Sequence, residues 1–224
     1  MAARPIGDSY GGYRSRLVEQ LRVQGIRDLS VLRAFGEVPR HLFIPTALRH
    51  QAYEDIALPI GNGQTVSQPT TQARFLEALE LTGTERVLEV GTGSGYQTAL
   101  LSLLVSLVVS VERVPSLAQS AKQALESAGV LGVTVVVGDG SLGWLPQAPY
   151  DAIVVAAAGP VVPEPLVHQL AENGKLVLPL NLGGHQEVWR VLRRNGTIVK
   201  ERLGEAHFVP LIGKHGFERP SEPA

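Results

Sequence analysis

The chain has 224 residues, 44% of them hydrophobic, and its 20 basic and 21 acidic side chains leave a formal net charge of -1. This profile is typical of a globular protein and excludes disorder for most of the chain. The balanced charge gives no reason to expect a nucleic acid partner. Because the sequence contains no cysteine, disulfides, thiolate nucleophiles and cysteine-ligated metal sites are also excluded.

The hydrophobic pattern gives no sign of membrane attachment. The longest apolar stretch, residues 99–111, has 13 residues and is interrupted by three serines, whereas a membrane-spanning helix needs about 20 residues. The beginning of the sequence has no continuous apolar core of the kind that secretory signals carry. We therefore expect a cytoplasmic protein without a membrane partner.

The N-terminal part of the chain is expected to be helical and irregular. Residues 1–13 are small, glycine-rich and aperiodic, which predicts a flexible lead. Helical periodicity begins at Arg14, and a second helix follows Asp28, a residue that can cap it. Residues 39–69 contain several prolines and no sustained period, and ordered loops of this length usually have a function. We interpret residues 14–69 as a helical cap followed by a substrate loop.

Strand and helix patterns alternate in the next part of the chain, starting from a helix that Thr70 or Thr71 is expected to cap. This rhythm predicts a parallel sheet covered by helices on both faces. The last two strands flank Asn195-Gly196, a dipeptide favoured in tight hairpin turns. The expected strands are 86–90, 107–111, 133–137, 152–155, 176–178, 187–192 and 197–202, and the expected helices between them are 96–104, 115–128 and 163–171.

These elements predict an α/β fold with a doubly wound, mostly parallel, seven-stranded sheet. An antiparallel hairpin ends the sheet, and a helical cap precedes it. We expect a single domain over residues 14–212, with the cofactor-binding core at residues 70–212. Residues 207–212 form a last extended segment, and the polar residues 213–224 are expected to be a flexible tail.

The sequence ERVLEVGTGSGYQTALL joins a buried strand to a helix through Gly91, Gly93 and Gly95. Glycine lets the backbone turn sharply and approach a ligand, and the helix N-terminus offers unpaired amides. The G-x-G-x-x-G turn of nicotinamide-binding proteins needs its third glycine one residue later, so the spacing disfavours NAD. The pattern acid-x-G-x-G-x-G, with Glu89 as the acid, instead resembles the signature of S-adenosylmethionine-dependent methyltransferases. A tight turn without a ligand is the alternative.

Two further acids follow the next two strands. Glu112 ends one strand, where a carboxylate can accept both hydroxyls of a ribose. Asp139, in GDG, can accept from an adenine amino group. Either acid alone is more often a solvated surface residue, but the carboxyl ends of neighbouring parallel strands meet at one crevice. The expected cofactor contacts are Glu89, Gly91, Thr92, Gly93, Ser94, Gly95, Glu112, Arg113, Gly138, Asp139 and Gly140.

The chemistry of the methyl acceptor determines which side chains such an enzyme needs. An amine, hydroxyl or carbon acceptor usually needs a base or a metal, and the six histidines show no metal-ligand spacing. A carboxylate is already ionised at neutral pH and needs only hydrogen-bond donors that orient it. The lack of an evident base therefore favours a carboxylate acceptor, and no metal is expected.

Seven segments occur in the order PRHLFIP, AYEDIALPIGNGQTVSQP, VLEVGTGSGYQTALL, VVSVER, GDGSLGW, APYDAIVVAAA and HFVPLI. In this combination they resemble the protein-L-isoaspartate (D-aspartate) O-methyltransferases over about residues 14–212. The resemblance implies a Rossmann-like fold, S-adenosylmethionine as cofactor, and repair of damaged proteins by methylation of the free α-carboxylate of L-isoaspartyl and D-aspartyl residues. Isoaspartyl-containing proteins and peptides are then the substrates, and we expect a monomer.

By the same resemblance, Ser67 in TVSQP is the active-site serine, and Thr65, Val66 and Val209 shape the substrate pocket. A hydroxyl is a poor base at neutral pH but a good donor, which agrees with a serine that orients the acceptor carboxylate. From its position in the sequence alone, Ser67 is more simply interpreted as a cap of the helix that follows.

One departure from the family leaves alternatives open. Thr70 and Thr71 stand where relatives often carry an aromatic residue or a histidine, so the resemblance does not assign the substrate contacts of these two positions. A methyltransferase with another acceptor, a nicotinamide-dependent dehydrogenase and a non-catalytic adenosyl-binding module are the competing hypotheses. Binding of S-adenosylmethionine and methylation of matched isoaspartyl and aspartyl peptides would discriminate between them.

Overall fold

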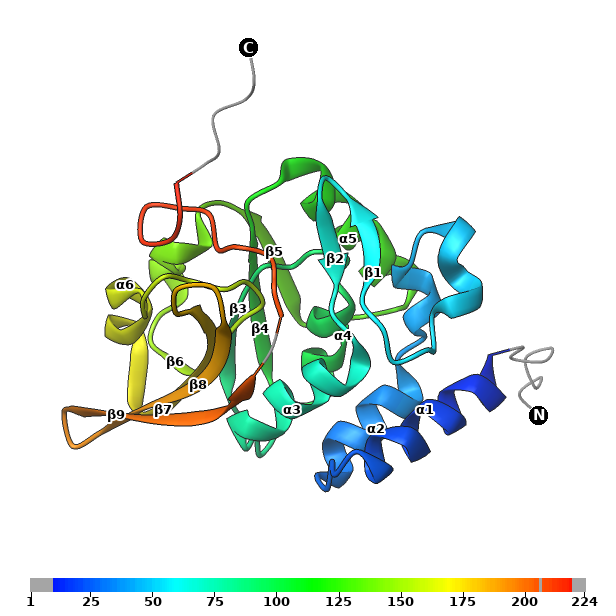
Figure 1. The fold of residues 1–224 in the computed structure, drawn as a ribbon, viewed down its shortest axis with the longest axis horizontal. Coiled ribbons are helices and arrows are strands. Elements are labelled where there is room, and N and C mark those ends of the chain that lie inside the picture. Colours follow the sequence, from blue (N-terminus) through cyan, green and yellow to red (C-terminus); the bar gives the residue numbers. More distant parts are fainter. Residues whose placement is uncertain (1–9, 206, 219–224) are drawn as a thin grey trace, which may run out of the picture.

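The centre of the fold is a seven-stranded sheet in the order β5-β4-β3-β6-β7-β8-β9 (Figure 1). The computed structural model describes residues 10–205 and 207–218. Neighbouring strands from β5 to β7 are parallel, whereas β8 is antiparallel to both of its neighbours. A smaller antiparallel sheet consists of β1 and β2. The strands are β1 (Leu58–Gly61), β2 (Gln64–Val66), β3 (Arg86–Val90), β4 (Leu107–Glu112), β5 (Val133–Val137), β6 (Tyr150–Val155), β7 (Leu170–Asn181), β8 (Gln186–Arg194) and β9 (Thr197–Glu205).

Helices cover both faces of the sheet. Buried side chains of α3, α4 and α5 belong to one hydrophobic cluster, and Leu166 of α6 belongs to the cluster on the other face. The pair α1 and α2 packs against α3 and forms the helical cap at the edge of the molecule in Figure 1. No helix in the described part of the chain is both long enough and apolar enough to cross a bilayer. The α-helices are α1 (Gly11–Val23), α2 (Leu29–Glu37), α3 (Pro69–Leu79), α4 (Tyr96–Ser102), α5 (Pro115–Ser127) and α6 (Glu164–His168).

Strand β3 shows why the sequence pattern predicts a sheet buried on both faces. Val87 belongs to one hydrophobic cluster, and Leu88 and Val90 belong to the other. Successive side chains of a strand point to opposite faces, so a strand between two layers of helices is apolar at almost every position. Glu89 is the exception, because its side chain is fully buried between the sheet and α4.

The structure confirms the predicted fold class. Strands β3 and β5 have the predicted bounds, while β7 is longer than the predicted strand at 176–178. The first helix begins at Gly11, so residues 11–13 are helical and the prediction of a flexible lead was wrong for them. Tyr10 is the N-cap residue of this helix, and residues 1–9 of the predicted lead lie outside the described residues.

Two irregular segments are more ordered than the sequence suggests. Residues 39–69 contain two short 3-10 helices, η1 (Arg40–Phe43) and η2 (Thr46–Gln51), and then the hairpin of β1 and β2. Residues 213–217 form a turn in which the amide of Gly213 donates to the carbonyl of Phe217 and the amide of Phe217 donates to that of Leu211. The predicted flexible tail is therefore wrong for this turn, and residues 219–224 are not among those described.

The N-cap of α2 gives a test of the helical cap. The Asp28 carboxylate accepts from the amides of Ser30 at 2.8 Å and Val31 at 3.2 Å. We expect Asp28→Ala to lower the free energy of unfolding by about 1 kcal/mol, because these first-turn amides lose their acceptor. Asp28→Asn keeps an acceptor oxygen and should stay within roughly 0.5 kcal/mol of the wild type. Urea denaturation of the three proteins measures both effects, and equal losses in the two variants would contradict the capping role.

Candidate functional site

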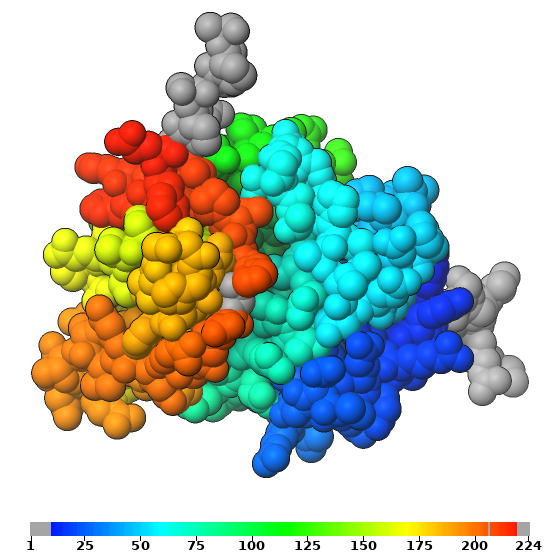
Figure 2. Space-filling model, in the orientation of Figure 1, coloured from blue at the N-terminus to red at the C-terminus, as the bar shows by residue number. Residues whose placement is uncertain are grey.

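A cavity opens at the carboxyl ends of β3, β4 and β6. The sheet order reverses between β3 and β6, and doubly wound sheets bind ligands at such a reversal. Figure 2 shows the hollow between the β1–β2 hairpin, in cyan, and the C-terminal segment, in orange. The space without protein atoms in and in front of the cavity is about 790 Å³, open solvent included. Its lining consists of Gln64, Thr65, Val66, Ser67, Gln72, Val90, Gly91, Thr92, Gly93, Ser94, Gln97, Val111, Glu112, Arg113, Val114, Gly140, Ala156, Ala157, Val209, Pro210, Leu211 and Ile212.

Two glycines at this site stand where a neighbouring segment lies too close to the main chain for a side chain. Gly95 has a φ of 86°, and a Cβ there would lie 3.3 Å from the Cβ of Ala121 in α5. At Gly140 a Cβ would lie 2.4 Å from Cγ1 of Val90, so only glycine lets this turn cross the end of β3. Gly95 thus lets its turn pack against α5, and Gly140 lets its turn pack against the end of β3. The part of the glycine-rich turn that faces the cavity runs from residue 91 to residue 94.

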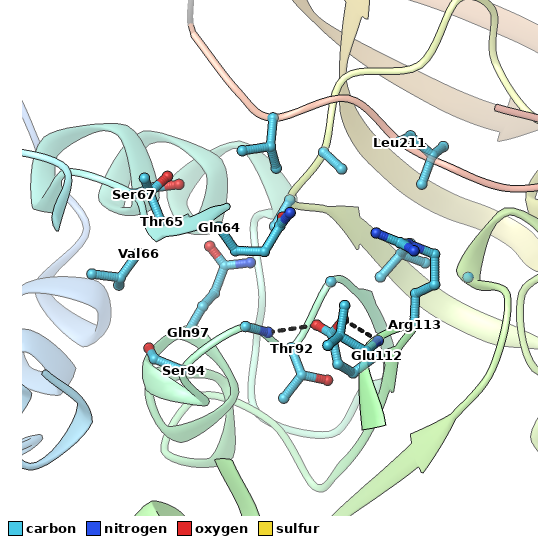
Figure 3. Close-up of a pocket in the computed structure, with 18 of the residues that line it drawn as sticks. Gln64, Thr65, Val66, Ser67, Thr92, Ser94, Gln97, Glu112, Arg113 and Leu211 are labelled. Atoms are coloured by element: carbon cyan, nitrogen blue, oxygen red, sulfur yellow. Dashed lines mark hydrogen bonds between the residues drawn. The ribbon is translucent and has the colours of Figure 1, made fainter. Parts of the chain in front are cut away.

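The carboxylate of Glu112 joins two turns at the edge of the cavity. Oε2 accepts from the amide of Gly93 at 2.9 Å, and Oε1 accepts from the amide of Val114 at 2.8 Å (Figure 3). Only 6% of Glu112 is exposed. A carboxylate oxygen can accept more than one hydrogen bond, so Glu112 can hold these amides and still accept from a ligand hydroxyl.

Glu89 lies behind the cavity and does not line it. Its Oε2 accepts from the hydroxyls of Thr98 at 2.5 Å and Ser110 at 2.6 Å. The Ser110 hydroxyl also lies 2.5 Å from that of Thr92, which does line the cavity. Burial raises the pKa of Glu89 to about 7, and the donors from Ser110, Thr98 and Gln97 oppose the shift. Glu89 is therefore linked to the cavity only through Ser110 and Thr92, and its direct contact with a cofactor stays a prediction.

Asp139 is engaged by the protein itself. Its Oδ1 accepts from the amide of Ser141 at 2.9 Å and the hydroxyl of Ser141 at 2.6 Å, and Oδ2 accepts from the amide of Lys214 at 2.8 Å. Partial burial raises the pKa of Asp139, but these donors outweigh it and the pKa is lowered overall. Asp139 thus holds the C-terminal turn, and its neighbour Gly140 is the residue that lines the cavity.

The residues predicted to contact the substrate lie together. Thr65 and Val66 belong to β2, Ser67 follows them, and Val209 comes from the extended segment near the C-terminus. In Figure 3, Ser67 and Val66 lie on the side of the cavity opposite to Arg113. The predicted substrate contacts on β2 and the residues after it thus lie on one side of the cavity, and the predicted cofactor contacts at the ends of β3 and β4 lie on another. We name these the acceptor side and the cofactor side after these predictions.

The predicted helix caps in this region were wrong. Helix α3 begins at Pro69 with Gln68 as its N-cap, and no side chain caps it, so neither Ser67 nor the two threonines have that role. Thr70 is buried and bonds to Asp55. Thr71 lines a separate groove between α3 and the pair β8–β9. The two threonines that depart from the family pattern therefore lie outside the cavity.

Most predicted site residues line one cavity, but Glu89, Gly95, Gly138 and Asp139 do not. Sequence reasoning missed three amide side chains, two alanines and the end of the C-terminal segment. The alanines follow the carboxyl end of β6, so the rule that ligands bind at these ends could have found them. The amide side chains carry no periodic signal. The missed residues are Gln64, Gln72, Gln97, Ala156, Ala157, Pro210, Leu211, Ile212 and three valines at or just after the ends of β3 and β4, Val90, Val111 and Val114.

Burial of Glu89 predicts a pH dependence of stability. In the unfolded chain its pKa is near the ordinary 4.5, whereas in the folded protein it is about 7. The stability that the protonated carboxyl contributes is present below the unfolded pKa and is lost as pH rises through the folded pKa. Because Glu89→Gln cannot ionise, its Tm relative to the wild type should rise between pH 5 and pH 8. Melts of Glu126→Gln, an exposed control on α5, should show no such trend, and a flat difference for Glu89→Gln would refute the prediction.

The two bonds of Glu112 predict a loss of ligand binding in Glu112→Gln. The amide has one acceptor oxygen, so its NH2 group must face the N–H of either Gly93 or Val114. We expect the Kd for S-adenosylhomocysteine to rise at least tenfold, or about 1.4 kcal/mol, in isothermal titration calorimetry. Glu126→Gln again serves as the control. A Kd within twofold of the wild type would show that Glu112 does not shape the cofactor side.

Known proteins resemble this chain over most of its length. The family model for protein-L-isoaspartate(D-aspartate) O-methyltransferases matches residues 13–216. A protein-L-isoaspartate O-methyltransferase of Methanoculleus marisnigri is 50% identical over 211 residues, which cover 94% of this chain and 96% of the relative. Protein-L-isoaspartate O-methyltransferase 1 of Rhodopseudomonas palustris is 48% identical over 221 residues, which cover 95% of this chain and 89% of the relative.

Solved structures give the same result. One named protein-L-isoaspartate O-methyltransferase has a TM-score of 0.82 and 33% identity, covering 91% of this chain and 67% of its own. A Plasmodium falciparum structure named for the same activity, in complex with S-adenosyl-L-homocysteine, has a TM-score of 0.78 and 27% identity, covering 89% of this chain and 98% of its own. Sequence, fold and cavity agree, and the chain belongs to the protein-L-isoaspartate(D-aspartate) O-methyltransferase family.

Proposed function

We propose that this protein transfers a methyl group from S-adenosylmethionine to the free α-carboxylate of L-isoaspartyl and D-aspartyl residues in damaged proteins and peptides. The observation that carries the proposal is that Ser67 lines the same cavity as the glycine-rich turn and Glu112. A methyl acceptor held by Ser67 and a cofactor held by the turn would therefore share one cavity. Membership in the family supplies the substrate class.

The cofactor side has the groups that S-adenosylmethionine needs. Residues 91–94 bring their main chain to the cavity beside the start of α4, and Glu112 keeps acceptor capacity for the ribose hydroxyls. Gly140 leaves space at the end of β3 that a side chain would fill. We assign cofactor binding to residues 91–94, Glu112, Arg113 and Gly140. When bound, S-adenosylmethionine supplies an electrophilic methyl group.

Ser67 orients the acceptor. An aspartyl α-carboxylate is ionised at neutral pH, so no group on the enzyme has to remove a proton from it. The Ser67 hydroxyl donates a hydrogen bond to one carboxylate oxygen and leaves the other oxygen directed at the cofactor side. Much of the acceleration of such a displacement comes from this placement of the two reactants.

The rest of the acceptor side limits the access of water. Val66 is buried and Val209 is half-buried, and both line the cavity. These apolar side chains strengthen the hydrogen bond from Ser67 by lowering the local dielectric constant. Thr65 is exposed and lies at the mouth of the cavity, where the polypeptide of a substrate would pass.

Further expectations extend this proposal. We expect the chain to act as a cytoplasmic monomer on protein and peptide substrates, without nucleic acid, membrane or metal as a partner. We also interpret residues 14–212 as a single domain, with the cap and substrate loop at residues 14–69 and the cofactor-binding core at residues 70–212. The balanced charge of the chain and the alternating strands and helices support these expectations.

Ser67→Ala tests the proposed role. We expect kcat/KM for an isoaspartyl peptide to fall at least tenfold, since the acceptor loses its orienting donor, while the Kd for S-adenosylhomocysteine stays within twofold of the wild type. The wild type should methylate the isoaspartyl peptide and leave the matched aspartyl peptide unmodified. Methylation of both peptides, or a large loss of cofactor binding in Ser67→Ala, would contradict the proposal.

A further inference from the structure

Arg40, in the segment PRHLFIP, contacts the acceptor side from behind. Its side chain is fully buried. Nη2 donates to the main-chain carbonyl of Ser67 at 2.9 Å, and Nη1 donates to Oε1 of Gln72 at 3.0 Å. Ser67 and Gln72 line the cavity, whereas Arg40 does not. The guanidinium therefore holds two cavity residues without facing a ligand itself.

The same guanidinium also contacts the start of α4. Its central carbon lies 4.6 Å from the centroid of the Tyr96 ring, which is within the range of a cation–π contact. Tyr96 is the first residue of α4 and follows the glycine-rich turn directly. Arg40 thus connects the turn that carries Ser67 to the helix that follows the turn expected to hold the cofactor.

Burial of the Arg40 guanidinium is unfavourable for the stability of the fold. Burial lowers the pKa of Arg40, although Tyr96 and Asp55 oppose the shift. Within the described residues, the bonds of its side chain go to a carbonyl and an amide rather than to a carboxylate, and Nε has no partner. A buried charge without a bonded counter-ion usually destabilises a fold. Its geometry, a planar group with donors in two directions, fits a role in positioning.

A second side chain holds the other end of the same turn. Asp55, in the segment AYEDIAL, accepts from the amide of Thr70 at 2.8 Å with Oδ1 and from its hydroxyl at 2.6 Å with Oδ2. Thr70 is buried and lies in the first turn of α3. Arg40 and Asp55 therefore hold the main chain on either side of Pro69, three residues apart at Ser67 and Thr70.

We propose that Arg40 and Asp55 are positioning residues that fix the main chain from Ser67 to Thr70, so that the Ser67 hydroxyl keeps a constant place relative to the glycine-rich turn. The proposal rests on the function proposed above for Ser67. Displacements well below 1 Å matter for a group that aligns two reactants, and the rotamers of such groups are fixed by residues behind them. The segment from 39 to 69 is mostly irregular. Hydrogen bonds from side chains, rather than those of a large sheet, therefore fix the main chain there.

Arg40→Lys tests the first of the two contacts. Lysine keeps the charge but cannot donate to Ser67 and Gln72 in the fixed directions of a guanidinium. We expect kcat/KM for an isoaspartyl peptide to fall at least tenfold and the Kd for S-adenosylhomocysteine to stay within twofold of the wild type. Arg33→Lys is the matched control, because Arg33 is an exposed residue of α2 paired with Glu37. Kinetics are measured at a temperature where melting curves show every variant folded.

A pair of substitutions at Thr70 tests the contact with Asp55. These variants still test the positioning role if Arg40→Lys does not fold. Thr70→Val keeps the shape of the side chain but loses the hydroxyl that donates to Asp55, whereas Thr70→Ser keeps that hydroxyl. We expect Thr70→Val to lower kcat/KM at least threefold at unchanged cofactor affinity, and Thr70→Ser to restore at least half of the wild-type value.

The outcomes separate this proposal from the proposed function. If Ser67→Ala lowers turnover but Arg40→Lys and Thr70→Val lower only Tm, the positioning role is refuted and the function of Ser67 stands. The role is also refuted if cofactor affinity falls in parallel with kcat/KM, because the defect is then not confined to the acceptor side. If Ser67→Ala has no effect on turnover, the proposed function itself fails.

Discussion

Two main-chain amides from separate turns share the Glu112 carboxylate as acceptor, one from Gly93 and one from Val114. A buried amide without an acceptor costs about 1–3 kcal/mol, so this carboxylate fixes the glycine-rich turn to the start of α5. The turn leads directly into α4. The guanidinium of Arg40 lies over the ring of Tyr96, the first residue of this helix. The geometry of the acceptor side therefore depends, through these contacts, on an acid at the end of β4.

The two sides of the cavity are built by different means. The cofactor side stands on the ends of parallel strands, which the sheet holds in register. The acceptor side stands on β2 and a turn, and a two-stranded sheet is only marginally stable by itself. Arg40, fully buried, and the Asp55 carboxylate supply the missing rigidity there. Burial of the guanidinium lowers the stability of the fold, but its hydrogen bond fixes the main chain at Ser67.

The sequence predicts the cofactor side better than the acceptor side, for physical reasons. Buried parallel strands and turns that need glycine leave strong local signals, so the sheet and the position of Glu112 could be read directly. The hydrogen bond from the Lys214 amide to Asp139 could not be predicted, because residues 75 positions apart in the sequence meet only in the folded chain. Hydrogen-bonding residues also have several local uses, which is why Thr70 looked like a cap although it bonds to Asp55. The role of Ser67 came from the family resemblance and not from any local signal.

The turn at residues 213–217 has a consequence for how the protein can be modified. Leu211 and Ile212 form part of the cavity wall. The amide of Leu211 donates to the carbonyl of Ala158, and further bonds come from residues beyond the wall, from the amides of Lys214 and His215 to Asp139 and Ser141. A truncation that ends the chain at Ile212 would keep every lining residue and still lose this anchor. Purification tags and fusion partners are therefore best attached after Phe217, where they leave the wall intact.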